Sequence, residues 1–196
     1  MRFNRIARLF MIGQSALMTN PPIIRNARSE DSTQIAEIYA HHVHNGTASF
    51  DTEPRSIEAT VAKIAECAKR GWPFLICADG QVILGYAYAT QFRDRPAYGL
   101  ACEDSIYVHP DNVGKGVGKL LLVALVDAAE AAGFRQMLAV IGGGEPASVA
   151  LHASLGFEHV GRMRSVGRKF GRWLDSVYMQ RALGAGGSQP PEKEPG

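Results

Sequence analysis

The stretch EDSIYVHPDNVGKGVGKLLLVALVDAAEAAG, residues 103–133, organises this chain of 196 residues. A β-type run opens it, turn residues and three alternate glycines follow, and an apolar helix is expected over residues 120–132, closed by Gly133. The free N–H groups and the dipole of a helix N-terminus favour an anion, and glycines let the loop backbone approach that anion closely. Strand, glycine loop and helix therefore predict a site for a phosphate-bearing cofactor.

The spacing of the glycines narrows the choice of cofactor. A Walker loop is excluded because leucine follows Lys119, and a dinucleotide fingerprint counted from Gly114 needs glycine where Lys119 stands. The pattern resembles the pyrophosphate loop of the GNAT N-acetyltransferases, Gln/Arg-x-x-Gly-x-Gly/Ala, with Gly116 and Gly118 in the glycine places and Val113 in the Gln/Arg place. The resemblance implies acetyl-CoA as cosubstrate. Taken alone, a glycine-rich turn before an ordinary core helix explains the loop equally well.

The composition is that of one soluble globular domain, with 46% hydrophobic and 20% charged residues. A net charge of +2 without a Lys/Arg run gives no sign of nucleic-acid binding, and no apolar run approaches the roughly 20 residues of a membrane span. The three cysteines, Cys67, Cys77 and Cys102, lack metal-ligand spacing and predict reduced thiols in a cytoplasmic protein. We therefore expect no metal, no nucleic acid and no membrane partner.

Both ends of the chain are expected to lie outside the folded domain. Residues 1–21 form an amphipathic, Arg-bearing extension, either a short transit-like segment or a translated leader before a true start at Met18. Residues 184–196 are rich in Gly, Pro and charge and predict a disordered tail. The N-acetyltransferase domain then covers residues 22–183.

Periodicity within that domain predicts an α/β fold with a mixed central sheet. Strands are expected over residues 23–27, 73–78, 82–90, 103–108, 136–141, 157–166 and 174–182, and helices over about 32–43, 57–69, 120–132 and 149–155. A hairpin turn is expected at Asp79 and Gly80. The order β-α-α-β-β-β-α-β-α-β-β is that of the GNAT acetyltransferase fold, so it supports the interpretation of the glycine loop.

Several stretches carry a closer resemblance, to the phosphinothricin N-acetyltransferases and the related methionine sulfoximine/sulfone acetyltransferases. They are TASFDTEP (47–54), FRDRPAY (92–98), ACEDSIYV (101–108), SVALHASLGF (148–157) and GRKFGRWLDSVYMQ (167–180). The resemblance spans about residues 23–183 and implies a homodimer that acetylates the α-amine of glutamate-analogue amino acids. The sequence departs from the family at Glu145, where the family tends to have Asn near the pantetheine.

Acetylation of an amine needs a proton acceptor, because an α-ammonium is mostly protonated at pH 7 and cannot attack a thioester. Glu103 begins the strand expected along the cofactor and coincides with the family's catalytic carboxylate; the alternative is a solvated charge at a strand start. His152 matches the family's active-site histidine, as a proton-relay or substrate residue, or else forms structural hydrogen bonds. The neighbouring Asp104 should point to the opposite face of the strand from Glu103.

The other expected site residues belong to the cofactor and to the acceptor. The resemblance assigns to the cofactor Ile106, Tyr107, Val108, Gly114, Lys115, Gly116, Val117, Gly118, Lys119, Glu145 and Ser148. Tyr107 is either a donor to the leaving thiolate or a core aromatic. Arg93 and Arg95 are candidates for bidentate contacts to the acidic groups of an amino acid, with Tyr98 nearby and Phe50 as a wall. Arg168, Lys169 and Arg172 are candidates for dimer contacts.

The sequence thus favours direct attack of an amino acid on acetyl-CoA in a ternary complex. Two alternatives stay open. One is transfer to another small primary amine, such as an unrelated amino acid or a polyamine. The other is a non-catalytic acyl-CoA-binding module of the same fold, against which the presence of both Glu103 and His152 argues.

Overall fold

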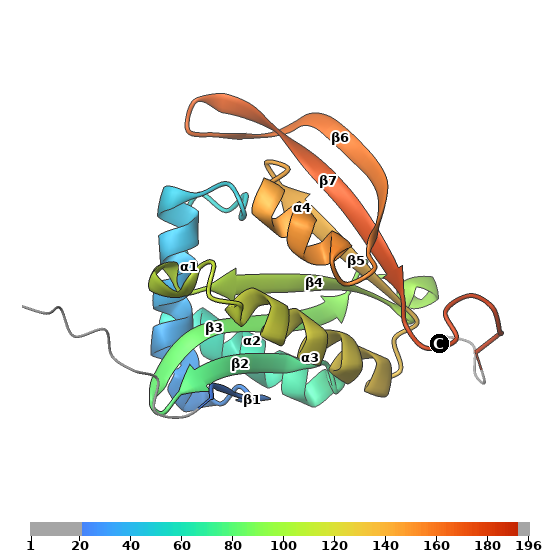
Figure 1. Ribbon diagram of the computed structural model, residues 1–196, viewed down its shortest axis with the longest axis horizontal. Helices are drawn as coiled ribbons and strands as arrows, with labels where there is room; N and C mark the ends of the chain where they lie inside the picture. The colour runs from blue at the N-terminus through green and yellow to red at the C-terminus, as the bar shows by residue number, and fades with distance from the viewer. Residues whose placement is uncertain (1–20, 192–196) are drawn as a thin grey trace, which may run out of the picture.

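The computed structural model describes residues 21–191, which form a seven-stranded sheet with helices on both faces (Figure 1). The strands are β1 (Ile23–Asn26), β2 (Phe74–Asp79), β3 (Val82–Gln91), β4 (Ala101–Val108), β5 (Gln136–Gly142), β6 (Glu158–Lys169) and β7 (Arg172–Ala182). The helices are α1 (Ser32–Asn45), α2 (Ile57–Arg70), α3 (Val117–Ala131) and α4 (Pro146–Ala153). The sheet order is β1-β2-β3-β4-β5-β7-β6, with only β4 and β5 parallel. This mixed α/β fold confirms the predicted element order.

Two hydrophobic cores lie on opposite faces of the sheet because alternate strand residues point to opposite sides. On one face Tyr86 of β3 packs with Ile35 of α1 and Ile64 of α2. On the other face its neighbour Ala87 belongs to the core that contains Leu121 of α3. Side chains of α4 pack against this second core. The sheet is therefore enclosed by α1 and α2 on one side and by α3 and α4 on the other.

Helix α3 begins at Val117, three residues before the predicted start. Its N-cap is Gly116, in the left-handed region at φ 85°. A side chain at Gly118, inside the first turn, would meet Leu151 at 3.3 Å and Val108 at 3.6 Å. Gly118 thus lets α3 pack closely against α4 and β4, a tertiary role that the sequence pattern does not distinguish from a loop glycine.

Other boundaries differ from the prediction by a few residues. Helix α1 continues to Asn45, and the turn between β2 and β3 lies at Gly80 and Gln81 rather than at Asp79 and Gly80. Helix α4 starts at Pro146, three residues early. Of the two chain ends, residues 1–20 and 192–196 lie outside the described residues. Within the described part of the tail, turns form in which Gly186 N–H donates to Leu183 O at 2.8 Å and Ser188 N–H to Ala185 O at 3.0 Å.

The two parallel strands in the centre of the sheet pair only where they begin. The ladder joins Ala101 to Gln136, Cys102 to Met137 and Glu103 to Leu138, although both strands continue beyond these pairs. The rest of β4 pairs on one side only, with β3, and the rest of β5 only with β7. Beyond Glu103 the strands therefore separate, and we call the opening between residues 104–108 and 139–142 the β4–β5 cleft.

Candidate active site

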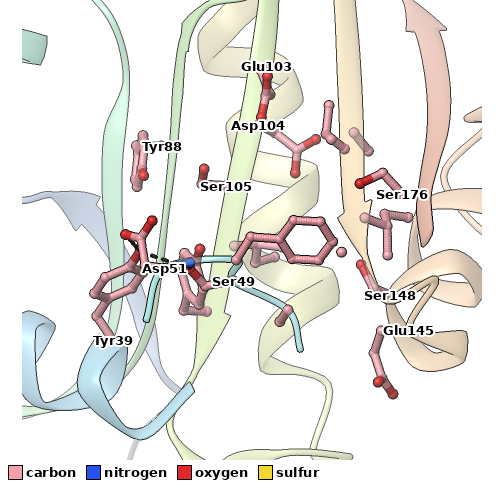
Figure 2. Close-up of a pocket in the computed structure, with 18 of the residues that line it drawn as sticks. Tyr39, Ser49, Asp51, Tyr88, Glu103, Asp104, Ser105, Glu145, Ser148 and Ser176 are labelled. Atoms are coloured by element: carbon pink, nitrogen blue, oxygen red, sulfur yellow. Dashed lines mark hydrogen bonds between the residues drawn. The ribbon is translucent and has the colours of Figure 1, made fainter. Parts of the chain in front are cut away.

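A cavity of about 340 Å³ lies at the closed end of the β4–β5 cleft (Figure 2). Its walls come from β4, β5, the loop after α1 and the start of α4. The lining residues are 48–51, 103–107 and 139–142, together with Tyr39, Arg55, Tyr88, Glu145, Ser148, His152 and Ser176. Carboxylates, hydroxyls, a guanidinium and aromatic rings thus line one half-open cavity, as expected of a site for a small polar ligand.

Glu103 lines this cavity at the last paired position of β4. Its side chain is 33% exposed, and its Oε2 lies 3.9 Å from Nη1 of Arg93. Burial raises the pKa of Glu103 to about 6; Arg93 opposes the shift and the neighbouring charge of Asp104 adds to it. Such a carboxyl is still ionised at pH 7 but binds a proton more readily than an ordinary glutamate.

Asp104 points to the opposite face of β4, as predicted, yet it lines the same cavity because the sheet is open here. Figure 2 shows its carboxyl directed toward the β5 side and that of Glu103 directed away. The side chains of Asp104 and His152 are both 2% exposed, and Nε2 of His152 lies 3.1 Å from Oδ2 of Asp104. The other oxygen, Oδ1, has no hydrogen-bond partner among the described residues. The pair therefore belongs to the site, although the sequence pattern singled out only the histidine.

His152 uses both of its ring nitrogens within the protein. Nδ1 lies 2.7 Å from the carbonyl oxygen of Ser148, which can only accept, so Nδ1 carries a proton. Nε2 then either donates to Asp104 as part of an imidazolium or accepts a proton from it. Burial alone would lower the pKa of His152, but the hydrogen bond and charge of Asp104 outweigh it and raise the pKa. This geometry leaves the ring no free nitrogen for a substrate.

The loop after α1 is fastened over the cavity by a buried lysine. Nζ of Lys169 donates to Gly46 O at 3.0 Å and Ser49 O at 2.8 Å, and burial lowers the pKa of its ammonium. Phe50, in the same loop, packs so closely on β5 and β6 that a side chain at Gly142 would meet its ring at 2.9 Å. Phe50 thus forms a wall of the cavity, and Lys169 is an internal residue.

The aspartate of the KFGRWLD motif (169–175) stabilises an irregularity in the hairpin of β6 and β7. Asp175 accepts from Nε of Arg162 at 2.7 Å and from the N–H of Ser165 at 2.8 Å. Ser165 has φ 53°, a left-handed conformation that costs energy for a residue with a side chain. The two ends of the motif, Lys169 and Asp175, therefore make structural contacts. These contacts explain why a lysine and an aspartate stand at these positions.

A guanidinium occupies the side of the cavity formed by α1 and β3. Arg55 lies over the ring of Tyr39, 4.3 Å from its centroid, and Nη2 donates to the hydroxyl of Tyr88 at 3.2 Å. Burial by itself would lower the pKa of Arg55, but Tyr88 and Tyr39 outweigh it, and the side chain stays cationic. Asp51 accepts a hydrogen bond from the Tyr39 hydroxyl. None of these four residues was predicted to be a site residue, although Asp51 lies in the TASFDTEP stretch and Arg55 directly follows it.

The glycine loop lies outside the cavity, at the N-terminus of α3. Gly114 and Gly116 have φ values of 77° and 85°, and the first helical hydrogen bond runs from Leu120 N–H to Gly116 O at 3.1 Å. The N–H groups of residues 117–119 therefore precede the hydrogen-bonded part of the helix and are available to an anion. Lys115 and Lys119 are exposed beside them, whereas the side chain of Val117 is buried in the core.

The expected pantetheine residues follow the cleft from the loop to the cavity. Ile106 and Tyr107 line the cavity from β4, and Glu145 and Ser148 line it from α4. Val108 continues β4 toward the glycine loop. The strand edges that β4 and β5 leave unpaired present N–H and C=O groups, which an extended chain bearing amides can bind as an added strand does. The cleft, its unpaired edges and the glycine loop thus fit a cofactor with amides at one end and phosphates at the other.

Tyr107 is packed among aromatic rings at the side of the cleft. Its ring meets Tyr39 edge-on at 5.2 Å and stacks on Tyr86 at 5.3 Å. Burial raises the pKa of its hydroxyl well above the usual value. The hydroxyl therefore keeps its proton at physiological pH and is able to donate a hydrogen bond.

The residues expected to bind the acceptor divide between the cavity and its surroundings. Phe50 lines the cavity, and Arg93 lies beside Glu103 with its own side chain 51% exposed. Arg95 and Tyr98 are not among the lining residues; Tyr98 packs edge-on against Phe92 at 5.8 Å. Within residues 21–191, no helix is long and apolar enough to cross a membrane, and no cluster of three metal-binding side chains occurs.

A mixed sheet that opens between its parallel strands, with an anion-binding loop at one end and a carboxylate-lined cavity at the other, defines an acetyl-CoA-dependent transferase. Residues 24–178 match the family described as an acetyltransferase (GNAT) domain. The chain belongs to the GNAT acetyltransferase family, and acetyl-CoA is its cosubstrate.

Within this family, the chain is similar to several proteins whose activities are named. The chain is 45% identical over 170 residues to a phosphinothricin N-acetyltransferase from Alcaligenes faecalis, covering 86% of each sequence. It is 40% identical over 168 residues to an L-methionine sulfoximine/L-methionine sulfone acetyltransferase from Pseudomonas aeruginosa, covering 85% of this chain and 98% of that one. A crystal structure of a phosphinothricin acetyltransferase from Sinorhizobium meliloti in complex with AcCoA superimposes with a TM-score of 0.86 at 44% identity, covering 89% of this chain and 95% of the other.

Proposed function

We propose that this protein transfers the acetyl group of acetyl-CoA to the α-amine of a small amino-acid analogue of the phosphinothricin, methionine sulfoximine or methionine sulfone type. The amine attacks directly, with both substrates bound. The printed names of the similar proteins support this acceptor class. The observation that carries the proposal is Glu103, a carboxyl with a pKa raised to about 6 in the cavity at the closed end of the cleft.

Glu103 would act as the general base. Bound acetyl-CoA supplies the thioester, whose carbonyl carbon bonds to the amine nitrogen as the carbon–sulfur bond breaks. The amine arrives protonated, and Glu103 would accept one proton, directly or through a water, so that the neutral amine can attack. The nitrogen would lose its second proton as the carbon–sulfur bond breaks, and that proton would end on the departing thiolate. A carboxylate with a pKa near 6 is matched to this task, because it is ionised at neutral pH yet more basic than an exposed glutamate.

His152 would act through Asp104 as a positioning residue. Its two hydrogen bonds join α4 to β4 next to Glu103, so it fixes the width of the cleft where the acceptor meets the thioester. Tyr107 would donate a hydrogen bond to the departing thiolate, which its protonated state at neutral pH supports. In this proposal His152 does not act as a base itself, because both of its ring nitrogens are used within the protein.

The remaining contacts follow the shape of the cleft. Pantetheine would lie along Ile106, Tyr107 and Val108. The pyrophosphate would lie against the glycine loop, residues 114–119, where the N–H groups of residues 117–119 are available. At the acceptor end Phe50 would wall the pocket, and Arg93, Arg95 and Tyr98 would meet the acidic or sulfonyl end of the side chain at its mouth.

We further propose a cytoplasmic homodimer. The outer strand β6 and its hairpin expose apolar side chains, Val160, Met163, Val166, Phe170 and Trp173, the last of them 64% exposed. An unpaired edge strand with apolar side chains is a usual surface for self-association. The test is the molar mass in solution, which should be twice that of the chain.

The test of the proposed activity is release of free thiol from acetyl-CoA across a panel of amines. Phosphinothricin, methionine sulfoximine and methionine sulfone should be acetylated with a much higher kcat/KM than glutamate or methionine. A pocket with donors for a tetrahedral oxygen-bearing centre leaves buried groups unpaired around a planar carboxylate or a thioether, at about 1–3 kcal/mol each.

The same panel separates the alternatives. Equal or better turnover of a polyamine would assign the enzyme to another primary amine and reject the amino-acid proposal. Binding of acetyl-CoA without turnover of any amine would instead identify a non-catalytic acyl-CoA-binding module.

A further inference from the structure

We propose that Arg55 binds the α-carboxylate of the acceptor, which makes the cavity selective for free α-amino acids over their amides. This inference rests on the proposed function. It adds a substrate-binding residue to the glycine loop and the arginines expected at the mouth. Arg55 would contact the substrate inside the cavity, on the side opposite α4.

The first argument is that Arg55 is a cation without a counter-ion. Among the described residues, no carboxylate lies within ion-pair distance of its guanidinium, whereas Arg25 and Arg162 have such partners at 2.7 Å. Its contacts are the face of the Tyr39 ring and the hydroxyl of Tyr88. A guanidinium has five N–H donors, and one hydrogen bond to a hydroxyl leaves most of them for a ligand. Because Arg55 is half-buried and lines the cavity, an anion bound there would be held in a partly desolvated place.

The second argument is the nearest acid, Asp51, which is engaged elsewhere. It accepts a hydrogen bond from the hydroxyl of Tyr39, and its own N–H donates to Ser49 Oγ at 3.1 Å. Asp51 thus fixes the tyrosine whose ring supports Arg55, instead of neutralising the guanidinium. The cation is held in place by aromatic contacts and keeps its charge for a ligand.

The third argument is that the hydrogen-bond partner of Arg55 lies on the same face of the sheet as the base. Tyr88 pairs with Ser105 and Thr90 pairs with Glu103, so the partner of Arg55 and the base lie on one face, as diagonal neighbours across β3 and β4. Arg55 and Glu103 also line the same cavity. An α-amino acid bound there would direct its ammonium toward Glu103 and its carboxylate toward Arg55.

The other cations near the cavity do not offer this arrangement. Lys63 lies 5.9 Å from the centre of the Tyr88 ring and is paired with Glu66 at 3.1 Å. Arg93 is close to Glu103 but half exposed at the mouth, where it suits a distal side-chain group. Of these three cations, Arg55 is therefore the one that a carboxylate next to the reacting amine would meet.

The test compares one acceptor with and without its carboxylate charge. Methionine sulfone is suitable because the α-carboxylate is its only anionic group, and its primary carboxamide keeps the amine and the side chain. The ratio of kcat/KM for acid over amide is measured in the wild type, in Arg55→Gln and in Arg55→Lys. Arg28→Gln, a change at an exposed arginine paired only with exposed Glu30, is the matched control.

Arg55→Gln should lower the acid-to-amide ratio by roughly 10- to 100-fold, the range for a lost charge-assisted hydrogen bond. Arg55→Lys should lose less, because it retains the charge but not the planar fork, and it remains informative if the glutamine variant fails to fold. The affinity for acetyl-CoA, measured by calorimetry, should not change in either variant.

Two outcomes distinguish the inference from the activity itself. A wild type that acetylates amino acids, combined with equal losses for acid and amide in both Arg55 variants, would overturn the role of Arg55 and reduce it to packing between α2 and α1. A wild type that acetylates neither methionine sulfone nor the other amino-acid analogues would overturn the proposed function, and with it the carboxylate site.

Discussion

The two ends of the β4–β5 cleft are built on different physical principles. At the open end the ligand groups are backbone N–H groups before Leu120, held by glycines at positive φ, and the nearby lysines are exposed. At the closed end the cavity is lined by side chains, two of which, Asp104 and His152, are almost fully buried. The open end depends on glycines, which lack side chains. The closed end depends on the charge and protonation state of its side chains.

This difference means that the two ends should fail in different ways. A bulky residue in the loop removes space and backbone conformation but leaves the titrating groups untouched. A change of charge in the cavity leaves the phosphate site intact but alters proton transfer. Binding of acetyl-CoA and the rate of acetyl transfer are therefore expected to separate when single residues are changed.

The largest effect is expected at the closed end. Glu103→Gln keeps the shape of the side chain but removes the proton acceptor, so kcat should fall by roughly 10²- to 10⁴-fold. Steady-state turnover measures the loss, and calorimetry should find the acetyl-CoA affinity nearly unchanged. The control is Glu37→Gln, which changes an exposed glutamate of α1. A variant with nearly full kcat at neutral pH would mean that Glu103 is not the base.

A smaller effect, of the opposite type, is expected at the open end. Gly116→Trp puts a bulky residue at φ 85°, where nothing lies within 4 Å of its Cβ but the anion site adjoins. The bulk of the indole in the space beside the anion site should raise the KM for acetyl-CoA about 10- to 100-fold, whereas the backbone strain of about 1–3 kcal/mol should lower mainly the stability of the fold. At saturating acetyl-CoA the kcat should stay near that of the wild type.

The matched control for the loop is Gly71→Trp, at the end of α2. Gly71 has φ 69° and equally open surroundings but lies away from the cleft, so it carries the strain without the site. A folded Gly116→Trp protein with unchanged acetyl-CoA affinity would contradict the placement of the pyrophosphate.

The smallest effect is a shift of pH dependence at the closed end. Glu103 must be deprotonated to accept a proton, so kcat/KM for the acceptor should rise with pH through a midpoint near 6, the raised pKa of this carboxyl. Arg93 lowers that pKa, so Arg93→Met should move the midpoint to higher pH. The pH profiles of the two proteins give the test. A midpoint that stays unchanged or moves to lower pH would show that the rise of kcat/KM with pH reports the titration of another group.

The open end could be predicted from the sequence because it is local. Gly114, Gly116 and Gly118 sit between a strand and a helix within one short stretch, an order that suits an anion site, and the family resemblance favours that interpretation over an ordinary turn. The fold was predicted for the same reason, since alternating strand and helix patterns are contiguous in the chain. The predicted boundaries differ from the structure by a few residues, as for α3, which begins at Val117 rather than at Leu120.

The closed end could not be predicted in full because its residues meet only in the folded chain. Glu103 and His152 were assigned through the family resemblance. Asp104 joins them because the sheet opens beyond Glu103, and strand periodicity says nothing about such an opening. Arg55 is charged, follows a loop and precedes an exposed helix start, so its pattern is that of a surface residue. Its place beside Tyr39 and Tyr88 depends on how α1 packs on the sheet.

The short ladder between β4 and β5 also links the stability of the protein to its supply of cosubstrate. Between β4 and β5 the edges beyond Glu103 lack a neighbouring strand, and acetyl-CoA bound in the cleft as proposed would complete this part of the sheet. A ligand that binds only the folded state raises the free energy of unfolding by about 2.7 kcal/mol when present at 100 times its Kd. At low acetyl-CoA concentration the protein should therefore unfold more readily than at high concentration.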